Sequence, residues 1–238
     1  MWWFHKKKSI KDSGLLDGFT DFHSHILPEV DDGIPTMKEA LEVLAWYEEM
    51  GIKKVVLTPH IMEEYPKNNR QYLLRQLEML KQQYKGKVEM TLGAEYMLDA
   101  SFDTHLLGGK LLTIESNHVL VETSCVNKPI KFEQLINELH TKGYHIILAH
   151  PERYTYMENK EYKILKEKHI FFQMNLLSLT GCYGEQVRLK AKMLLSKRYY
   201  EYIGTDIHNL KFHQNQLHHK NPKLNENEMK QIKQLIRS

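Results

Sequence analysis

Histidine and carboxylate side chains recur along this chain at spacings that suit metal binding. The first group is DFHSH, residues 21–25, near the start of the chain. Side chains on a strand alternate between its two faces, so a strand over residues 19–24 points His23 and His25 the same way. Two imidazoles on one face can share a metal ion, and Asp21 on that face is a candidate acceptor for an imidazole N–H. Among 14 histidines in 238 residues, roughly one such pair is expected by chance, so the later groups decide its meaning.

Apolar strand-like runs alternate with helical runs along the chain. The expected strands cover residues 19–24, 52–57, 88–95, 118–122, 144–149, 170–175 and 200–205. The expected helices cover residues 36–50, 69–84, 132–142, 162–168, 185–197 and 226–236, the first of them opened by a Thr36–Glu39 capping box. About seven βα units without a linker imply a parallel sheet and favour a closed or nearly closed barrel. An open doubly wound sheet is the alternative, but no glycine-rich phosphate loop follows the first strand.

The chain has the composition of one soluble globular domain, spanning residues 1–238. Residues 1–18 form an N-terminal extension and residues 212–238 a polar, helical C-terminal region. A net charge of +3 gives no support for a nucleic acid partner, and no stretch is apolar for long enough to be an integral membrane segment. The only cysteines, Cys125 and Cys182, supply neither a disulfide framework nor a thiolate metal site, so we expect a cytoplasmic protein. The sequence leaves open the oligomeric state and the role of three N-terminal aromatic residues, Trp2, Trp3 and Phe4.

The ends of the expected strands carry most of the candidate ligands. In an α/β barrel the active site lies at the carboxyl ends of the strands. Every expected strand but the sixth ends at or beside a histidine or a carboxylate. These residues are His23, His25, His60, Glu95, Glu122, His150, Asp206 and His208, with Asp31 and Asp32 in the loop after the first strand. One such residue is commonplace as a helix cap, but a whole set of imidazoles and carboxylates without thiolates indicates a site for Mn²⁺, Fe²⁺ or Zn²⁺.

The same residues follow the motif order of the polymerase and histidinol phosphatase (PHP) superfamily. The finer motifs resemble those of the bacterial capsular polysaccharide tyrosine phosphatases of the CpsB/CapC/YwqE type. These motifs are DxHSHxLPxxDDG, TPH, GAE, VLVE, AHPERY, NLLSLTGCYG and TDIHN, which together run from about residue 19 to residue 210. The resemblance is specific because all of these spaced motifs agree in order.

The resemblance implies a distorted (β/α)7 TIM-like barrel, the PHP fold, that holds three divalent metal ions, with Mn²⁺ preferred. Carried over by residue, the first ion takes His23, His25, Glu95 and Asp206. The second takes Glu95 as a bridge, Glu122 and His150. The third takes Asp32, His60 and His208, with Asp31 as the neighbouring alternative to Asp32. The implied substrate is a phosphotyrosine protein, a bacterial tyrosine autokinase that controls capsular or exopolysaccharide synthesis and export.

We therefore expect metal-dependent hydrolysis of phosphotyrosine, with Arg153, Asp206 and His208 as the catalytic residues. In this interpretation a hydroxide bridging two metal ions attacks phosphorus, and Arg153 holds the phosphate oxygens with its planar fork. The proton donor stays open between a metal-bound water and His208. Related phosphatases often carry an arginine five residues after the last motif histidine, where this chain has His213. That difference predicts weaker or pH-dependent phosphate binding.

Two other phosphatase classes are alternatives. One is a small-molecule phosphatase of the same superfamily, for example one acting on histidinol phosphate. The other uses Cys182 and Arg188, whose C-x5-R spacing is typical of cysteine-dependent tyrosine phosphatases. Glu185 argues against the second class because it places a negative charge in the phosphate cradle. A barrel that only binds a phosphorylated partner is a third, non-enzymatic alternative. Outside the ligand set, Asn175 and Ser178 are candidates for shaping the pocket, and Tyr154 and Tyr156 either line an aromatic substrate pocket or pack. Glu152, beside Arg153, forms an ion pair with it, supports the ligands from behind or lies at the surface.

Overall fold

The structure, a computed structural model, describes residues 9–218 and 224–237. The three N-terminal aromatic residues, Trp2, Trp3 and Phe4, lie outside these residues. Within them the strands are β1 (Thr20–Ser24), β2 (Lys54–Leu57), β3 (His60–Ile61), β4 (Glu89–Leu92), β5 (Glu95–Met97), β6 (His118–Glu122), β7 (His145–Ala149), β8 (Phe171–Asn175) and β9 (Tyr200–Gly204). Each of the seven expected strand regions contains at least one of these strands, which confirms the expected α/β alternation.

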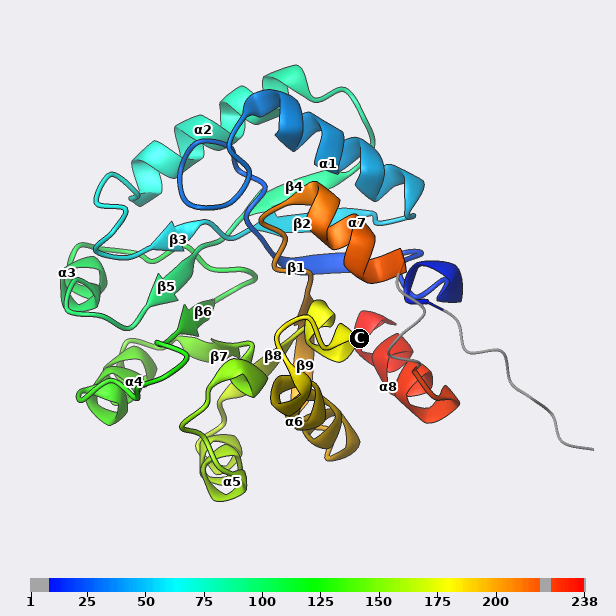
Figure 1. Ribbon diagram of the computed structural model, residues 1–238. Coiled ribbons are helices and arrows are strands. Elements are labelled where there is room, and N and C mark those ends of the chain that lie inside the picture. The colour runs from blue at the N-terminus through cyan, green and yellow to red at the C-terminus, as the bar shows by residue number, and fades with distance from the viewer. Residues whose placement is uncertain (1–8, 219–223, 238) are drawn as a thin grey trace, which may run out of the picture.

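The helices lie outside the strands and surround them (Figure 1). The α-helices are α1 (Met37–Glu49), α2 (Arg70–Gln83), α3 (Phe102–Leu107), α4 (Phe132–Thr141), α5 (Asn159–Glu167), α6 (Glu185–Ser196), α7 (Leu210–His218) and α8 (Glu226–Arg237). Short 3-10 turns are η1 (Lys11–Ser13), η2 (Pro151–Arg153) and η3 (Leu176–Thr180). The expected cap of α1 is confirmed, because the Thr36 hydroxyl accepts a hydrogen bond from the backbone N–H of Glu39.

The strands pair in parallel in two sheets, ordered β1-β2-β4 and β3-β5-β6-β7-β8-β9. After the expected second strand ends at Leu57, Thr58-Pro59 breaks the pairing and the unexpected strand β3 follows, and the expected third strand is interrupted at Gly93-Ala94 before β5; both β3 and β5 belong to the larger sheet. Proline has no backbone N–H for a ladder, which explains the first break. Strand β9 approaches β1 through a parallel bridge between Ser24 and Ile207. The parallel α/β fold is thus confirmed, but the described residues form no single closed sheet.

Alternate residues of the same strands belong to two apolar clusters. Val119 and Val121 of β6 join the large core beneath the helices, whereas Leu120 between them joins a smaller cluster with Val56 and Ile147. Strands that are buried on both faces read as continuous apolar runs, as β6 and β7 do. Both faces of these strands are therefore covered by apolar side chains. A functional site can form only at the strand ends, where the polar residues lie.

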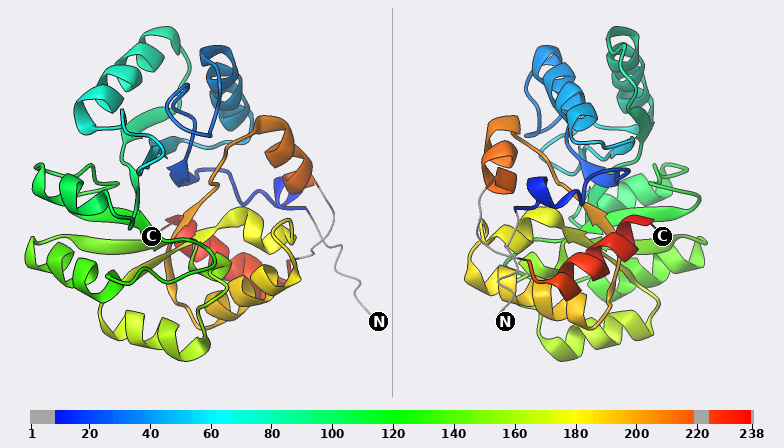
Figure 2. Two further views of the ribbon diagram at one scale, coloured as in Figure 1. Left: turned by 60° about the vertical axis from the view of Figure 1, so that its left-hand side comes forward. Right: turned by 90° about the vertical axis from the view of Figure 1, so that its right-hand side faces the viewer.

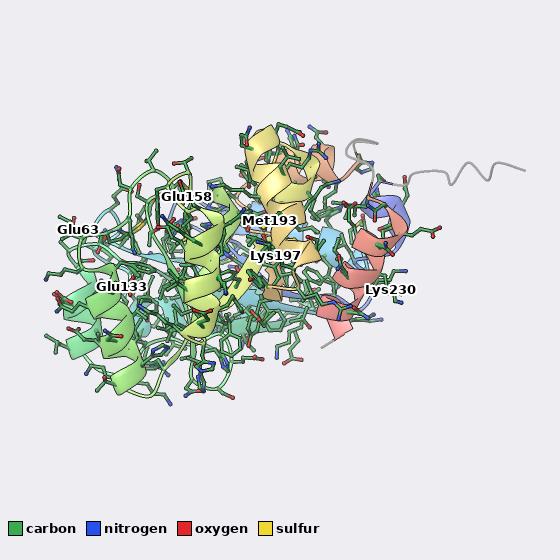
Figure 3. The ribbon with its side chains drawn as sticks, turned by 90° about the horizontal axis from the view of Figure 1, so that it is seen from below. Glu63, Glu133, Glu158, Met193, Lys197 and Lys230 are labelled. Atoms are coloured by element: carbon green, nitrogen blue, oxygen red, sulfur yellow. The ribbon has the colours of Figure 1, made fainter. Side chains whose placement is uncertain are left out.

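The C-terminal part of the chain folds back against the strands. Helix α8 packs beside β9 and α6, and its Ile232 is fully buried (Figure 2). Seen from below, α4, α5, α6 and α8 follow one another along the molecule (Figure 3). The sequence reading missed α3, which has only six residues, and α7, which is largely polar. No helix in the described ranges is both long and apolar enough to cross a membrane.

Candidate metal centre

The predicted ligands come together where the strands end or break. His23 lies in β1 with His25 just beyond it, His60 begins β3 and Glu95 begins β5. Glu122 ends β6, His150 follows β7, and Asp206 and His208 follow β9. Residues that are more than 180 positions apart in the chain thus share one site, because parallel strands place their carboxyl ends at one edge.

The most deeply buried group contains His23, His25, Glu95 and Asp206, the four residues predicted for the first ion. Their donor atoms all lie within 4.8 Å of one another. Nε2 of His23 lies 3.1 Å from Glu95 Oε2 and 3.4 Å from Asp206 Oδ1. Nε2 of His25 lies 3.3 Å and 3.5 Å from the same two oxygens. Two imidazole nitrogens and two carboxylate oxygens converging on one point suit a divalent transition metal.

Two further groups share members with the first. One contains His60, Glu95 and Glu122, and the other contains His25, Asp32, His60 and His208. His150, predicted with Glu95 and Glu122, has its Nε2 3.0 Å from Glu95 Oε1 and 3.8 Å from Glu122 Oε2. His60 is therefore within reach of both the second and the third predicted ion, whereas the sequence-based assignment places it with the third ion alone.

Several buried polar atoms in this centre have no hydrogen-bond partner. They include Nδ1 of His60, Nδ1 of His150 and Oε1 of Glu122. His60 Nδ1 and Glu122 Oε1 face each other at 3.0 Å without forming a hydrogen bond. Buried polar atoms are normally satisfied, so atoms left facing one another fit a centre built to bind cations.

Side chains behind the imidazoles fix which ring nitrogen faces the centre. His23 Nδ1 donates to Gln173 Oε1 at 2.6 Å, and His25 Nδ1 donates to Asp31 Oδ2 at 2.9 Å. Both rings therefore direct Nε2 inward. Asp31 acts as a support, whereas Asp32 faces the centre with Oδ1 3.5 Å from His60 Nε2. Gln173 was not predicted as a partner of a ligand, because the sixth expected strand ends in neither a histidine nor a carboxylate. Its position near the carboxyl end of that strand nevertheless places it at the site.

Asp21 does not contact an imidazole, contrary to the sequence-based suggestion. It accepts hydrogen bonds from the hydroxyls of Tyr47 and Thr205 and from the backbone N–H groups of His23 and Thr205. Burial raises the pKa of its carboxyl, and these bonds oppose that effect. Asp21 therefore ties α1, β1 and the end of β9 together beneath the centre.

Two of the predicted ligands have strained backbones. His150 has φ 32° and Asp206 has φ 54°, a region that residues other than glycine rarely adopt. Such conformations persist where the surroundings enforce them, and they cluster at functional sites. Gly204, next to the strained segment, lies so close to β1 that an added Cβ would be 2.3 Å from the Cβ of His23. The absence of a side chain there lets β9 approach β1 and bring Asp206 to His23.

The opposed charges strongly perturb the pKa values of the centre. Burial lowers the pKa of His60, but its close contact with Glu122 and the charges of Glu95 and Glu122 outweigh that effect and raise the pKa to about 10. The pKa of His23 is raised to about 9 in the same way, against burial, by Glu95 and Asp206. Burial also opposes ionisation of Asp206, yet the charges of His23 and His208 hold its pKa well below its ordinary value. A bound cation would take the place of the imidazole protons, since ligands must be deprotonated.

Arg153 lies beside the centre at the end of η2. Its Nη1 donates to Asp206 Oδ2 at 3.0 Å, and its guanidinium lies 4.6 Å from the centre of the Tyr183 ring. Asn175 Nδ2 donates to the same Asp206 oxygen at 2.7 Å and also contacts the Tyr183 hydroxyl. Tyr183 was not singled out from the sequence, although it belongs to the NLLSLTGCYG motif. The guanidinium is thus held at the edge of the centre, partly open to solvent.

The chain also matches a family of known proteins. Residues 19–236 match the family model described as capsular polysaccharide synthesis, CpsB/CapC. The chain belongs to the CpsB/CapC family. Tyrosine-protein phosphatase YwqE of Bacillus subtilis is 27% identical to it over 197 residues, covering 80% of this chain and 78% of YwqE. Tyrosine-protein phosphatase CpsB of Streptococcus pneumoniae is 27% identical over 203 residues, covering 80% and 83%.

The fold of this CpsB/CapC chain is also similar to a solved one. A chain from the crystal structures of YwqE from Bacillus subtilis and CpsB from Streptococcus pneumoniae, described as metal-dependent tyrosine phosphatases, matches with a TM-score of 0.70. The sequence identity is 26%, and the match covers 83% of this chain and 84% of that chain. The family membership inferred from the motifs is therefore confirmed by sequence and by fold.

Some residues of the CpsB/CapC motifs lie behind the centre rather than in it. Glu152 is buried and accepts hydrogen bonds from Asn175 N and Tyr200 Oη, so it forms no ion pair with Arg153. The buried Tyr154 hydroxyl accepts from Thr123 N. Tyr156 Oη lies 2.7 Å from Thr123 Oγ1, and buried Ser178 has an unpartnered hydroxyl. Tyr154 thus packs beneath the centre and does not form a wall of a substrate pocket.

His213 does not take the place of a phosphate-binding arginine in this CpsB/CapC chain. It is buried beneath the loop that carries Asp206 and His208, with Nε2 3.0 Å from the carbonyl oxygen of Thr205 and Nδ1 3.2 Å from that of Asn209. Burial lowers its pKa against the opposing effect of these two carbonyl contacts, which favours the neutral imidazole. Its position argues against a direct effect on phosphate binding and makes it a support of the loop.

The geometry around Cys182 does not suit thiol catalysis. The thiol donates to the carbonyl oxygen of Leu177, and burial raises its pKa, whereas a nucleophilic cysteine needs a lowered pKa. Arg188 forms a two-point ion pair with Glu185 instead of facing a phosphate cradle. The metal centre is the better candidate for the chemistry.

Proposed function

We propose that this CpsB/CapC chain is a metal-dependent phosphatase that hydrolyses phosphotyrosine in proteins. The observation that carries the proposal is the convergence of five imidazoles and four carboxylates beside Arg153. Its relatives YwqE and CpsB are named tyrosine-protein phosphatases, and the matching crystal structures are described as metal-dependent. The names of the relatives and the residues of this site therefore support the same activity.

We assign the metal ions to the predicted ligand sets, with Mn²⁺ preferred over Fe²⁺ or Zn²⁺. Three ions would be held by His23, His25, Glu95 and Asp206, by Glu95, Glu122 and His150, and by Asp32, His60 and His208. Divalent ions supply activation of water and neutralisation of charge on the phosphate oxygens. Glu95 lies within reach of His23, His25, His60 and His150, which supports its role as the bridge.

Arg153 is the proposed phosphate-binding residue. Its planar guanidinium can donate two parallel hydrogen bonds to phosphate oxygens, and its contact with Tyr183 orients it toward Asp206. A tyrosine leaving group has a pKa of only about 10, so it departs more easily than an alkoxide. His208 donates Nδ1–H to the Asp206 carbonyl and has Nε2 3.6 Å from Asp32, which favours metal binding over proton donation.

The finer biological assignments rest on the family. We propose a bacterial tyrosine autokinase as substrate, in the cytoplasm, because the family is described by capsular polysaccharide synthesis. We also propose that the two sheets work as one distorted barrel, supported by the hydrogen bonds Asp206 N to His23 O and His25 N to Ile207 O between β9 and β1. These contacts would keep the ligands of both sheets at fixed separation.

The test is hydrolysis of a phosphotyrosine peptide before and after chelation, with Mn²⁺ added back. We expect activity to fall with the chelator and return with metal, and Cys182→Ala to retain wild-type activity. Activity that is unchanged by the chelator but lost in Cys182→Ala would contradict the proposal. Faster turnover of histidinol phosphate than of the peptide would instead indicate the small-molecule class.

A further inference from the structure

The loop over residues 124–131, which connects β6 to α4, exposes two apolar side chains. Val126 has an exposed fraction of 63% and Ile130 of 105%. Among the described residues, every other exposed large hydrophobic side chain belongs to a helix: Leu74, Met79, Leu107, Ile164, Leu189 and Phe212. Single exposed apolar residues need no explanation, but two within five residues of one loop indicate a contact surface.

The loop is fixed next to the proposed catalytic centre. It starts two residues after Glu122, and the carbonyl oxygen of Cys125 accepts hydrogen bonds from Thr155 N at 2.7 Å and Thr155 Oγ1 at 3.0 Å. Thr155 is two residues beyond Arg153, so Val126 is held close to the arginine's chain segment. The arrangement fixes the base of the loop beside the guanidinium that is proposed to bind phosphate.

The charged side chains of the loop are already paired. Lys128 Nζ lies 3.1 Å from Glu133 Oε1, and Lys131 Nζ lies 3.1 Å from Asp103 Oδ2 on α3. These pairs hold the loop's C-terminal half against two helices. The charges of both lysines are thus balanced, and the loop presents the apolar side chains of Val126 and Ile130 to an incoming chain beside the exposed polar Ser124 and Asn127.

We propose that Val126 and Ile130 form a docking surface for the polypeptide that flanks the target phosphotyrosine, and that this surface binds apolar substrate side chains. This inference rests on the proposed function. A phosphotyrosine bound at Arg153 is attached to a chain that has to leave over the surface beside the site, and the 124–131 loop is tied through Cys125 and Thr155 to the segment that carries Arg153. An apolar residue of the substrate that covers Val126 and Ile130 would remove both from water.

The test compares two phosphotyrosine peptides that differ only in having isoleucine or serine on either side of the phosphotyrosine. For the metal-loaded wild-type protein we expect kcat/KM to be roughly tenfold higher for the isoleucine peptide, the effect of burying one aliphatic side chain. The double variant Val126→Ser/Ile130→Ser should lose most of this preference. Both proteins should hydrolyse p-nitrophenyl phosphate equally, because that substrate is too small to reach the loop.

Met79→Ser is the matched control, since Met79 is a similarly exposed apolar residue on α2. It should leave the peptide preference intact. The proposal is overturned if the wild type shows no preference, or if the double variant loses p-nitrophenyl phosphate turnover in parallel. It is also overturned if the double substitution only dissociates an oligomer on size-exclusion chromatography, which would make the loop an interface between copies. No turnover of either peptide by the wild type, with other phosphate esters cleaved, would contradict the proposed function itself.

Discussion

At the scale of residues, the centre depends on side chains that do not face it. Gln173 and Asp31 each hold the outer nitrogen of an imidazole, and Asp21 gathers hydrogen bonds from three segments beneath the ligands. The contacts of Gln173 with His23 and of Asp21 with Thr205 could not be derived from spacing along the chain, because they join different strands. The side chains behind a metal ligand fix its orientation and its basicity, so they should influence binding nearly as strongly as the ligands.

Substitution of Gln173 tests this support. In Gln173→Leu the Nδ1–H of His23 loses its acceptor, and we expect metal affinity to fall by about 10–100-fold. Isothermal titration calorimetry of Mn²⁺ binding to the metal-free protein measures the change in affinity. Gln173→Glu keeps an oxygen at the same place and should retain most of the affinity. Equal affinity in Gln173→Leu and wild type would show that the His23 ring is held by other contacts.

His213 should make stability depend on pH. Burial lowers its pKa, so the folded protein keeps it neutral while the unfolded chain takes up a proton near its ordinary pKa of about 6.5. The unfolded state thus binds more protons, and the stability that His213 contributes is present above pH 6.5 and is lost as the pH falls towards the lower pKa of the folded state.

Urea unfolding of the chelated protein between pH 8 and pH 5 measures this effect. We expect His213→Gln to lose less stability than wild type over the acidic part of this range, because glutamine does not titrate. Parallel curves for wild type and His213→Gln would contradict a neutral buried imidazole.

At the scale of elements, the approach of β9 to β1 assembles the centre. The hydrogen bond from Asp206 N to His23 O measures 2.8 Å. The two strands are so close at Gly204 that no side chain would fit between them. The alternation of apolar and polar runs predicted most strands and helices, since burial imposes those periods on the sequence. It did not predict strand β3 after Pro59, the interruption at Gly93 or the short helix α3, because these segments are too short to show a period.

Gly204→Ala should separate β9 from β1. The added methyl group would meet the Cβ of His23, so we expect a loss of about 1–3 kcal/mol in the free energy of unfolding together with weaker metal binding. Chemical denaturation and a Mn²⁺ titration measure the two effects. Gly108→Ala, at the end of α3 with an ordinary φ of −72°, is the control and should change neither by much. A stable Gly204→Ala protein with normal metal affinity would mean that the strands move apart without cost.

At the scale of the whole molecule, the proposed ligands belong to six strands of two sheets. Metal ions that bind them would connect β1 with β3, β5, β6, β7 and β9, including the junction where the sheets do not pair as a ladder. A ligand that binds only the folded state stabilises it by mass action. Metal loading should therefore affect global unfolding as well as activity.

Thermal unfolding checks this expectation. At a Mn²⁺ concentration a hundredfold above the dissociation constant, the protein should gain about 2.7 kcal/mol per independent site, with Tm rising as the metal concentration rises. The double variant His23→Ala/Asp206→Ala, which removes ligands from β1 and from the end of β9, should show a much smaller rise. A wild-type Tm that does not respond to metal or chelator would argue against these residues as the binding site.

The sequence by itself determined the residue types, their order and the strand ends on which they stand. Those features were sufficient to predict the α/β class, to recognise the CpsB/CapC family and to choose the candidate ligands, because motif order and apolar periodicity can be seen in the linear sequence alone. Only the tertiary structure decided that Asp32 and not Asp31 faces the centre, that Asp21 and His213 are supports, and that the strands lie in two sheets. These outcomes depend on contacts between segments far apart in the chain, and neither spacing nor composition fixes which side chain of a neighbouring strand will accept a given hydrogen bond.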